Sequence, residues 1–284
     1  MATKTRIYVP RIEHAKIESG ALFANSGYGY EMLGYNPNTY ALVIAPSVAL
    51  RIKLEADDSA TSVIWGTDAI NFAGIYMRYP YDMVAGSSTV VIASTPLSNY
   101  TSLSTRNTIY CNQNTVDQPL AFATFATTTD KYWQLTINRN SAVNCQIAMV
   151  FIGTYFDLAR SPDFNDTDES RFDVQQTDLG MGRVLSRLGI SSARRVFLRS
   201  YNKMTDAELA ILRKAHTAAY GPHVPIVLVD ARDSASFDAK NGRLMRFMNP
   251  RISPRRIITL ADGTRWDVDV GFEELAQLPF GRSY

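Results

Sequence analysis

The stretch KYWQLTINRNSAVNCQIAMVFIG, residues 131–153, contains two segments with the composition of β-strands. YWQLTI alternates apolar and polar residues, and CQIAMVFIG is a longer apolar run; the Asn and Ser residues between them favour a turn. No helical stripe of ten or more residues precedes residue 150. The first half of the chain is therefore predicted to be an antiparallel β-sandwich, of jelly-roll or galactose-binding-like type. Its other expected strands lie in YALVIA, ALRIKLEA, SVIWG, GIYMRY, SSTVVIAS and LAFATFAT.

Charge and hydropathy exclude several classes of protein. The 284 residues include 29 Lys and Arg and 27 Asp and Glu, and this net charge of +2 gives no electrostatic reason to expect a nucleic-acid partner. The longest apolar stretch, YALVIAPSVAL (40–50), is far shorter than the roughly 20 residues of a membrane span. MATKTRIYVPRIEHAK, at the start of the sequence, lacks the apolar run of a secretory signal. We therefore expect synthesis and folding in a cytoplasm, and no membrane partner.

Residues 158–178 differ in composition from the sequence on either side. LARSPDFNDTDESRFD (158–173) is acidic, contains Pro162 and has few residues that fill a core, which predicts a connector. The expected organisation is a β-sandwich domain over 1–157, a connector over 158–178, and a smaller β-rich domain with one helix over 179–284. In the last domain, the Asp-Gly of ADGT (261–264) predicts a hairpin. The strand-like runs there are RRVFLRSYN, VPIVLVDA, LMRFMN, RRIITLA and TRWDVDVGFEE.

Residues 205–220 have the pattern of one well-capped α-helix. Thr205 and Glu208 form the T-x-x-E of a capping box, and Met204 and Leu209 are spaced for a hydrophobic staple. Gly221, followed by proline, suits a left-handed residue that ends the helix. A single helix of this length is expected to bury its apolar stripe against a neighbouring sheet.

The sequence shows no motif that would place a cofactor or a metal ion. It contains no G-x-S-x-G, H-E-x-x-H, Walker loop or C-x-x-C. The spacing of Cys111 and Cys145 matches no metal site, and in a reducing compartment two separate buried thiols are favoured over a disulfide. His216 and His223 lie near the end of the expected helix, where the helix dipole accounts for a histidine. We therefore predict no metal site and no cofactor.

Pairs of carboxylates are the remaining candidates for catalysis, because a glycosidase needs only two. In a strand, Asp267 and Asp269 lie on one face and Trp266 and Val268 on the other, which is the alternation of any half-exposed strand. Charged residues normally lie on the solvated face, so no catalytic residue is predicted and the protein is not expected to be an enzyme. The pairs considered are Asp230 with Asp233, Asp267 with Asp269, and Glu273 with Glu274.

Two stretches are candidates for contact with partners. ANSGYGYEMLGYNPNTY (24–40) is rich in tyrosine, which gives a large contact area at low entropy cost; it either binds a sugar or another chain, or folds over its own sandwich. RVLSRLGISSARRVFLR (183–199) has five arginines and no acid beside the acidic residues 163–178, which favours an ion-pair surface between subunits over DNA binding. The candidate contact residues are Tyr28, Tyr30, Tyr35, Arg183, Arg187, Arg194, Arg195 and Tyr284.

Three segments resemble parts of a known family. KYWQLTINRNSAVNCQIAMVFIGTYFDLARSPDFN (131–165) is similar to the end of a discoidin-like, or galactose-binding-like, domain in tail-associated structural proteins of tailed bacteriophages. There a [KR]-Y-W-x-[LI]-x-I strand precedes an apolar strand ending in F-x-G, and then a connector. SVIWGTDAINFAGIYMRY (62–79) resembles an earlier part of such domains, and RRVFLRSYNKMTDAELAILRKAHTAAYG (194–221) with PIVLVDARD resembles their strand–helix–strand unit. The resemblance covers roughly residues 60–240, and its motifs consist mostly of packing and turn residues.

The resemblance implies an assembly role in the virion, as a subunit of a tail, tail-tip, collar or fibre-attachment ring. The expected partners are other virion proteins and copies of the chain itself, in a hexameric or trimeric ring. Extended segments such as TRIYVP (5–10) and residues 276–284 are expected to add strands to a neighbour's sheet. The alternative is a carbohydrate-binding or receptor-binding module, in which Tyr28, Tyr30 or Tyr35 would be exposed to a glycan.

Overall fold

The computed structural model describes most of the predicted strands and the predicted helix. Within the described residues the chain is mainly antiparallel β-structure with one α-helix, α3 (Asp206–Ala218), which confirms the expected fold class. The described residues are 5–11, 15–19, 33, 40–43, 45–54, 69–77, 88–111, 120–139, 145–159, 162, 167–171, 174–178, 184–188, 194–230, 242–260 and 263–275.

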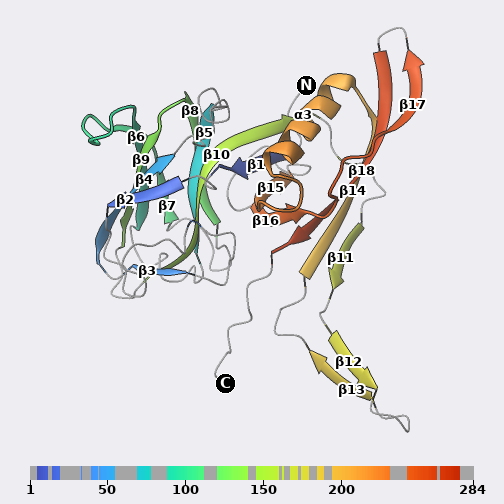
Figure 1. Ribbon diagram of the computed structural model, residues 1–284, viewed down its shortest axis with the longest axis horizontal. Helices are drawn as coiled ribbons and strands as arrows, with labels where there is room; N and C mark the ends of the chain where they lie inside the picture. Colours follow the sequence, from blue (N-terminus) through green and yellow to red (C-terminus); the bar gives the residue numbers. More distant parts are fainter. Residues whose placement is uncertain are drawn as a thin grey trace.

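A two-layer β-sandwich occupies the first half of the chain (Figure 1). One layer is a five-stranded antiparallel sheet in the order β2-β4-β9-β6-β7. The other layer is formed by β3, β10, β5 and β8, in which β10 pairs with both β3 and β5. The strands of the first layer are β2 (Ala15–Ser19), β4 (Ser47–Leu54), β9 (Tyr132–Asn138), β6 (Thr89–Thr95) and β7 (Ser104–Tyr110); those of the second are β3 (Ala41–Val43), β10 (Cys145–Leu158), β5 (Ile70–Met77) and β8 (Leu120–Thr128).

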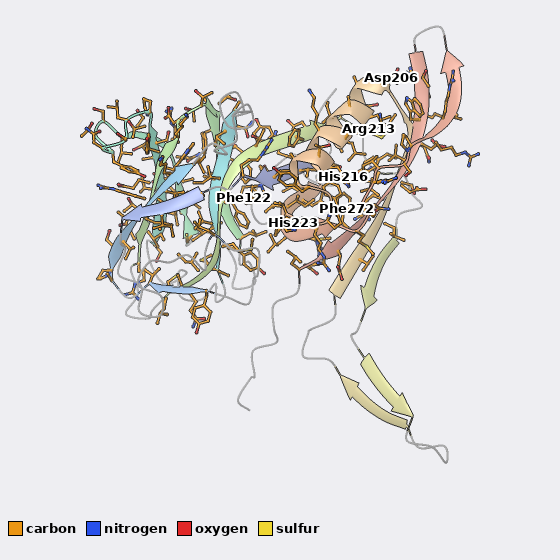
Figure 2. All side chains as sticks on the ribbon, viewed as in Figure 1. Phe122, Asp206, Arg213, His216, His223 and Phe272 are labelled. Carbon is orange, nitrogen blue, oxygen red and sulfur yellow. The ribbon has the colours of Figure 1, made fainter. Side chains whose placement is uncertain are left out.

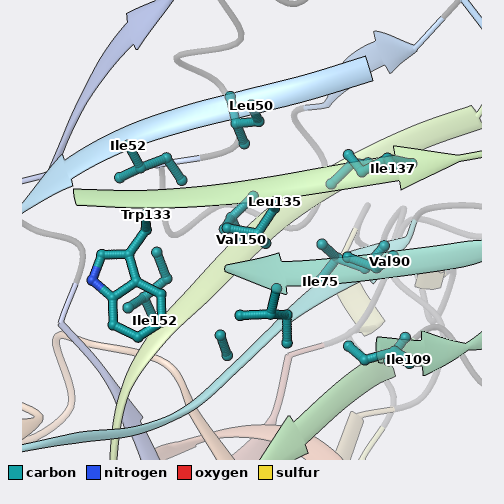
Figure 3. Close-up of a cluster of buried hydrophobic side chains, with 14 of the residues drawn as sticks. Leu50, Ile52, Ile75, Val90, Ile109, Trp133, Leu135, Ile137, Val150 and Ile152 are labelled. Atoms are coloured by element: carbon teal, nitrogen blue, oxygen red, sulfur yellow. The ribbon is translucent and has the colours of Figure 1, made fainter. Parts of the chain in front are cut away.

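The alternation along β4 and β9 fills the space between the two layers. In β9 every second residue is fully buried, and β4 buries its alternate residues in the same way (Figure 3). β-branched and aromatic side chains suit this pleated, half-buried surface. Trp133 is the largest side chain in this core, and its Nε1 donates to the carbonyl oxygen of Asp130 at 2.9 Å. Cys111 and Cys145 are both buried in this core as free thiols, as predicted.

The second layer of the sandwich continues into the second half of the chain as one large sheet. Its order is β11-β14-β18-β16-β15-β1-β10-β5-β8, with β17 paired to β18. β1 joins the two halves, because it pairs with β10 on one side and with β15 on the other (Figure 1). The strands not yet bounded are β1 (Thr5–Pro10), β11 (Thr167–Arg171), β14 (Arg194–Met204), β15 (Ile226–Asp230), β16 (Gly242–Phe247), β17 (Arg255–Leu260) and β18 (Gly263–Glu274).

This position of β1 corrects one expectation. TRIYVP was expected to be an arm that adds to a neighbouring chain, but both edges of β1 pair with strands of its own chain. Its backbone groups are therefore satisfied within the chain, which leaves no free edge for strand addition.

β10 is longer than its F-x-G motif predicts. The strand does not end at Gly153 but runs on to Leu158, because β1 takes over as its partner from Gly153 onwards. Gly153 lies where the strands approach closely: a Cβ there would overlap the carbonyl oxygen of Val9 and lie 2.9 Å from Pro10 Cα. Only glycine allows this backbone contact.

Helix α3 covers one face of the second half of the sheet. Thr205 and Glu208 form the predicted capping box, and Leu209 and Leu212 are buried against the sheet. The helix ends with Tyr220 and Gly221 both in the left-handed region. Figure 2 shows His216 on this helix, and its Nε2 donates to the carbonyl oxygen of Asn249 at 2.8 Å, so the last turn is attached to the segment that follows β16.

The opposite face of the sheet carries a third core that spans the junction of the two halves. Tyr8 of β1 lies at its centre, with its ring centroid 5.0 Å from that of Phe72 and 4.7 Å from that of Phe122. Beside it, the Arg6 guanidinium donates to both carboxylate oxygens of Asp157 and stacks over the Tyr155 ring, 4.0 Å from its centroid. The two halves are thus joined by packing and charge as well as by strand pairing.

Ionisation of Tyr8 is expected to destabilise this junction at high pH. Burial raises the pKa of Tyr8 from 10.0 to about 12, although its hydrogen bond to Arg6 acts in the opposite direction. Above pH 10 the unfolded chain loses the Tyr8 proton while the folded chain retains it, so the stabilisation present below pH 10 is lost by pH 12. We expect Tyr8→Phe to reduce the fall in the free energy of unfolding over this window by about 2 kcal/mol. Denaturant unfolding of both proteins at several pH values would measure it, and parallel curves would contradict it.

The predicted connector contains secondary structure. β11 pairs with β14 at one edge of the large sheet, and β12 (Val174–Asp178) pairs with β13 (Val184–Leu188) in a separate two-stranded sheet that Figure 1 shows away from the body. The predicted domain boundaries stay a prediction.

The predicted ADGT hairpin is confirmed, since β17 and β18 pair up to Leu260 and Gly263. No helix in the described part of the chain has the length and apolarity of a membrane span.

Candidate ligand-binding face of the sandwich

The residues predicted to contact partners lie largely outside the described structure. Tyr28, Tyr30, Tyr35, Arg183 and Tyr284 fall outside the described residues. For the others only the backbone is described: Arg187 lies in β13, and Arg194 and Arg195 begin β14. The contacts of these residues with partners therefore stay predictions. The acidic and arginine-rich segments, expected to meet between subunits, instead pair with each other within one chain, β11 with β14 and β12 with β13.

The outer face of the five-stranded sheet carries a row of polar side chains across four strands. The strand register places Tyr110 of β7 opposite Thr89 of β6, Thr89 opposite Asn138 of β9, and Asn138 opposite Ser47 of β4. Neighbouring strands lie about 4.8 Å apart, so the row extends about 14 Å across the face. The Tyr110 side chain, at the β7 end of the row, is 56% exposed.

Hydrogen bonds fix the orientation of this row. Ser47 Oγ donates to Asn138 Oδ1 at 2.7 Å, and Asn138 Nδ2 donates to Thr89 Oγ1 at 3.2 Å. An amide held from both sides presents its remaining lone pair and hydrogen in a fixed direction. The row therefore offers ordered donors and acceptors next to an exposed aromatic ring.

A second polar group lies further along the same face. Arg51 Nε donates to Gln134 Oε1 at 3.1 Å, and Gln134 Nε2 donates to Thr136 Oγ1 at 3.2 Å. The Arg51 guanidinium lies over the Tyr100 ring, 5.0 Å from its centroid, and Tyr100 makes an edge-to-face contact with Tyr132. The face thus combines a cation, amides and hydroxyls with tyrosine rings.

The four strands that carry the polar row have charges of one sign. β4, β6, β7 and β9 contain Arg51, Lys53 and Arg106 and no acidic residue. The Arg106 guanidinium is hydrogen-bonded within the sandwich: it donates to Asp130 Oδ2 at 2.6 Å and to Ser94 Oγ at 2.7 Å. Arg51 and Lys53 of β4 therefore give this part of the face a positive charge.

The carboxylates that the sequence raised as catalytic candidates have structural partners where they are described. Asp267 Oδ1 accepts from the backbone N–H of Lys203, and Asp269 Oδ1 accepts from Ser200 Oγ at 2.6 Å. Asp267 and Asp269 share one face of β18 while Val268 is buried on the other, as predicted. Glu273 and Glu274 form ion pairs with Arg246 and Arg243. The Asp230 side chain and Asp233 lie outside the described residues.

No grouping of His, Cys, Asp and Glu within the described ranges could hold a metal ion.

The polar row was not predicted from the sequence, although the sequence contains a signal for it. The alternation of YWQLTIN and SVALRIKL places Asn138 and Ser47 outward, but which residues stand side by side depends on the register between strands. Tyr110 was missed because STRNTIY, with its many polar residues, was not interpreted as a strand.

Comparison with known proteins gives only distant structural matches. No family model and no curated protein matches the chain. The carbohydrate-binding module CBM32 of AlyQ in complex with 4,5-unsaturated mannuronic acid matches with 17% identity and a TM-score of 0.35, covering 51% of this chain and 96% of that chain. CBM32-3 from a family 31 glycoside hydrolase of Clostridium perfringens matches with 14% identity and a TM-score of 0.38, covering 51% and 94%.

A further match is CpGH89 from Clostridium perfringens in complex with GlcNAc-alpha-1,4-galactose, with 10% identity and a TM-score of 0.38, covering 51% of this chain and 14% of that chain. TM-scores this low add nothing to the fold assignment. That the first half of the chain is a β-sandwich follows from its own strand pairing.

Proposed function

We propose that the protein binds carbohydrate, without cleaving it, through the outer face of the five-stranded sheet. The observation that carries this proposal is the row Tyr110–Thr89–Asn138–Ser47, which places an exposed aromatic ring beside hydrogen-bonded amide and hydroxyl groups. Tyrosine supplies a flat apolar surface and a polar tip, which suits the C–H face and the hydroxyl edge of a pyranose. Asn138 provides a donor and an acceptor for adjacent hydroxyls.

The preorganisation of this face favours binding at low entropic cost. Asn138 is held by Ser47 and Thr89, so a ligand need not immobilise its side chain. Arg51 and Lys53 on the same sheet favour glycans that carry a carboxylate or a sulfate over neutral ones. The proposed ligand class is therefore a polysaccharide, with acidic members bound more tightly.

The test is binding of the purified protein to a glycan array, followed by calorimetry with the best glycan. We expect Tyr110→Ala to weaken binding at least tenfold and Asn138→Ala to weaken it severalfold, since each removes a direct contact. The matched control is Tyr220→Ala, because Tyr220 is a similarly exposed tyrosine (48%) at the end of α3, far from the face in sequence and sheet position. The glycan should be recovered unchanged after incubation.

A protein that binds no glycan, or that binds equally well after Tyr110→Ala, would overturn this function. Release of shorter sugars would show that the protein is an enzyme instead.

A second candidate function is that of a virion structural subunit of a tailed phage, which acts by assembly. The observation that favours it is the β12–β13 hairpin, which pairs with no other described strand and extends from the body (Figure 1). An isolated two-stranded hairpin is marginally stable in water, so a partner surface is expected to cover it. Detection of the chain in purified virions, and a hexameric or trimeric mass by light scattering, would support this role; a monomer absent from virions would exclude it.

A further inference from the structure

Arg51 lies on the outer face of the five-stranded sheet without a carboxylate partner among the described residues. Its side chain is half-buried, and its one side-chain hydrogen bond there runs from Nε to Gln134 Oε1 at 3.1 Å. Four other arginines do have such partners: Arg6, Arg106, Arg243 and Arg246 pair with Asp157, Asp130, Glu274 and Glu273. The charge of Arg51 is therefore not neutralised by the described part of its own chain.

Two contacts fix the direction of the Arg51 guanidinium. Gln134, which accepts from its Nε, is itself held, because Gln134 Nε2 donates to Thr136 Oγ1 at 3.2 Å. The guanidinium also lies over the ring of the buried Tyr100, 5.0 Å from its centroid. No described residue accepts from the two terminal nitrogens of Arg51, and this end of the planar fork matches the two oxygens of a carboxylate.

An acidic residue, Glu18 of β2, lies next to Arg51 in the strand register. Ser19 pairs with Arg51, and Glu18 stands in the irregularity between Ile17 and Ser19. The Glu18 side chain is outside the described residues. It is therefore one of the positions that the experiment below changes.

Arg51 and the polar row share one face of the sheet, and short side chains lie between them. Arg51 follows Ser47 by four residues in β4, which corresponds to about 13 Å along the strand. Between them the exposed Ala49 lies opposite Thr136. The span is longer than one sugar ring, so a ligand that reaches both ends must be an oligosaccharide lying along the strands.

We propose that Arg51 binds the carboxylate of a uronic acid unit in an oligosaccharide, another unit of which lies on Tyr110 and Asn138. This inference rests on the proposed function, and it adds the residue that recognises the acidic group and a minimum length of ligand. Because the guanidinium is already oriented, recognition depends on its paired donors as well as on its charge. A lysine at this position would keep the charge and lose the fork.

The test is calorimetry of the full chain with oligomers of galacturonate and of mannuronate. Each oligomer is compared with its methyl ester, which keeps the sugar and removes the charge. We expect the wild type to bind at least one of the two acids about tenfold more tightly than its ester, because a hydrogen bond to a charged group is stronger than one to a neutral group. Monomeric uronates should bind more weakly than the oligomers, because they cannot reach both ends of the site.

Three variants separate the parts of the site. R51Q should remove the preference for the acid while the affinity for the ester stays unchanged, and R51K should restore only part of the preference. Tyr110→Ala should weaken binding of acid and ester by the same factor. The matched control is R213Q, which removes an exposed arginine on α3 (Figure 2) and should keep the preference. Circular dichroism should show that all variants are folded.

Equal affinity of the wild type for acid and ester would overturn the assignment, as would a preference that survives in R51Q or is complete in R51K. Tighter binding of a sulfated polysaccharide than of either oligouronate would also overturn it. E18Q should leave the acid affinity unchanged; a gain would show that Glu18 is the partner of Arg51 and would contradict the proposal. If Tyr110→Ala still weakens binding of neutral glycans, the proposed function stands without this inference, whereas a protein that binds no glycan at all overturns both.

Discussion

Gly153→Ala is expected to destabilise the protein by about 3 kcal/mol or more, the upper end of the cost of overpacking. The added methyl group would overlap the carbonyl oxygen of Val9 and lie 2.9 Å from Phe72 Cε1. Val9 belongs to β1, which cannot move away without losing its pairing with both β10 and β15. The free energy of unfolding from denaturant titration would measure the effect.

Gly271→Ala is the matched control, because Gly271 also lies in a strand of the large sheet. Its added Cβ would lie 3.2 Å from side-chain atoms of Met248 and Asn249, which can shift slightly. We expect a loss of about 1 kcal/mol for this variant. Equal losses at the two positions would show that β1 does not lie as close to β10 as described.

Trp133→Ala is expected to cost about 3–5 kcal/mol, because it empties the largest side-chain site in the sandwich core. Trp133 is fully buried, packs against Phe125 at a centroid distance of 5.6 Å, and donates its N–H to Asp130. The carbonyl oxygen of Asp130 would lose that donor. The Asp130 side chain also accepts from Arg106 and Ser94, so the change would extend to the edge of the sandwich. Thermal and denaturant unfolding would both report the change.

Trp266→Ala provides the comparison, since Trp266 is only partly buried and its N–H donates to Asp206 near the surface. We expect this variant to lose about 1–2 kcal/mol, in proportion to the smaller apolar area it buries. A smaller loss for Trp133→Ala than for Trp266→Ala would contradict the described core.

The sequence was sufficient for the elements that local pattern determines. The alternation in YWQLTIN predicts β9, and the capping box with Gly221 predicts α3, because these signals depend on residues close together in the chain. The role of TRIYVP could not be obtained in this way. Its partners lie at residues 145–158 and 226–230, and the same apolar segment suits an arm toward another chain equally well.

The candidate binding face was not predictable for a similar reason. Ser47, Thr89, Tyr110 and Asn138 are ordinary polar residues in four separate segments, and only the register between strands makes them neighbours. The tyrosine-rich segment 24–40 was predicted to contact partners because of its unusual composition. Composition identifies candidate aromatic residues, whereas a binding face is defined by long-range pairing.

The position of β1 has a consequence for the order in which the protein folds during synthesis. Arg6 leaves the ribosome long before Asp157, its partner 151 residues later, and β15 emerges later still. β1 therefore stays unpaired until β10 has been synthesised, and it gains its second partner only when residue 230 is available. Because contacts of such long range are slow to form, a nascent chain with unpaired β1 and β10 edges is the species most exposed to aggregation and to chaperones.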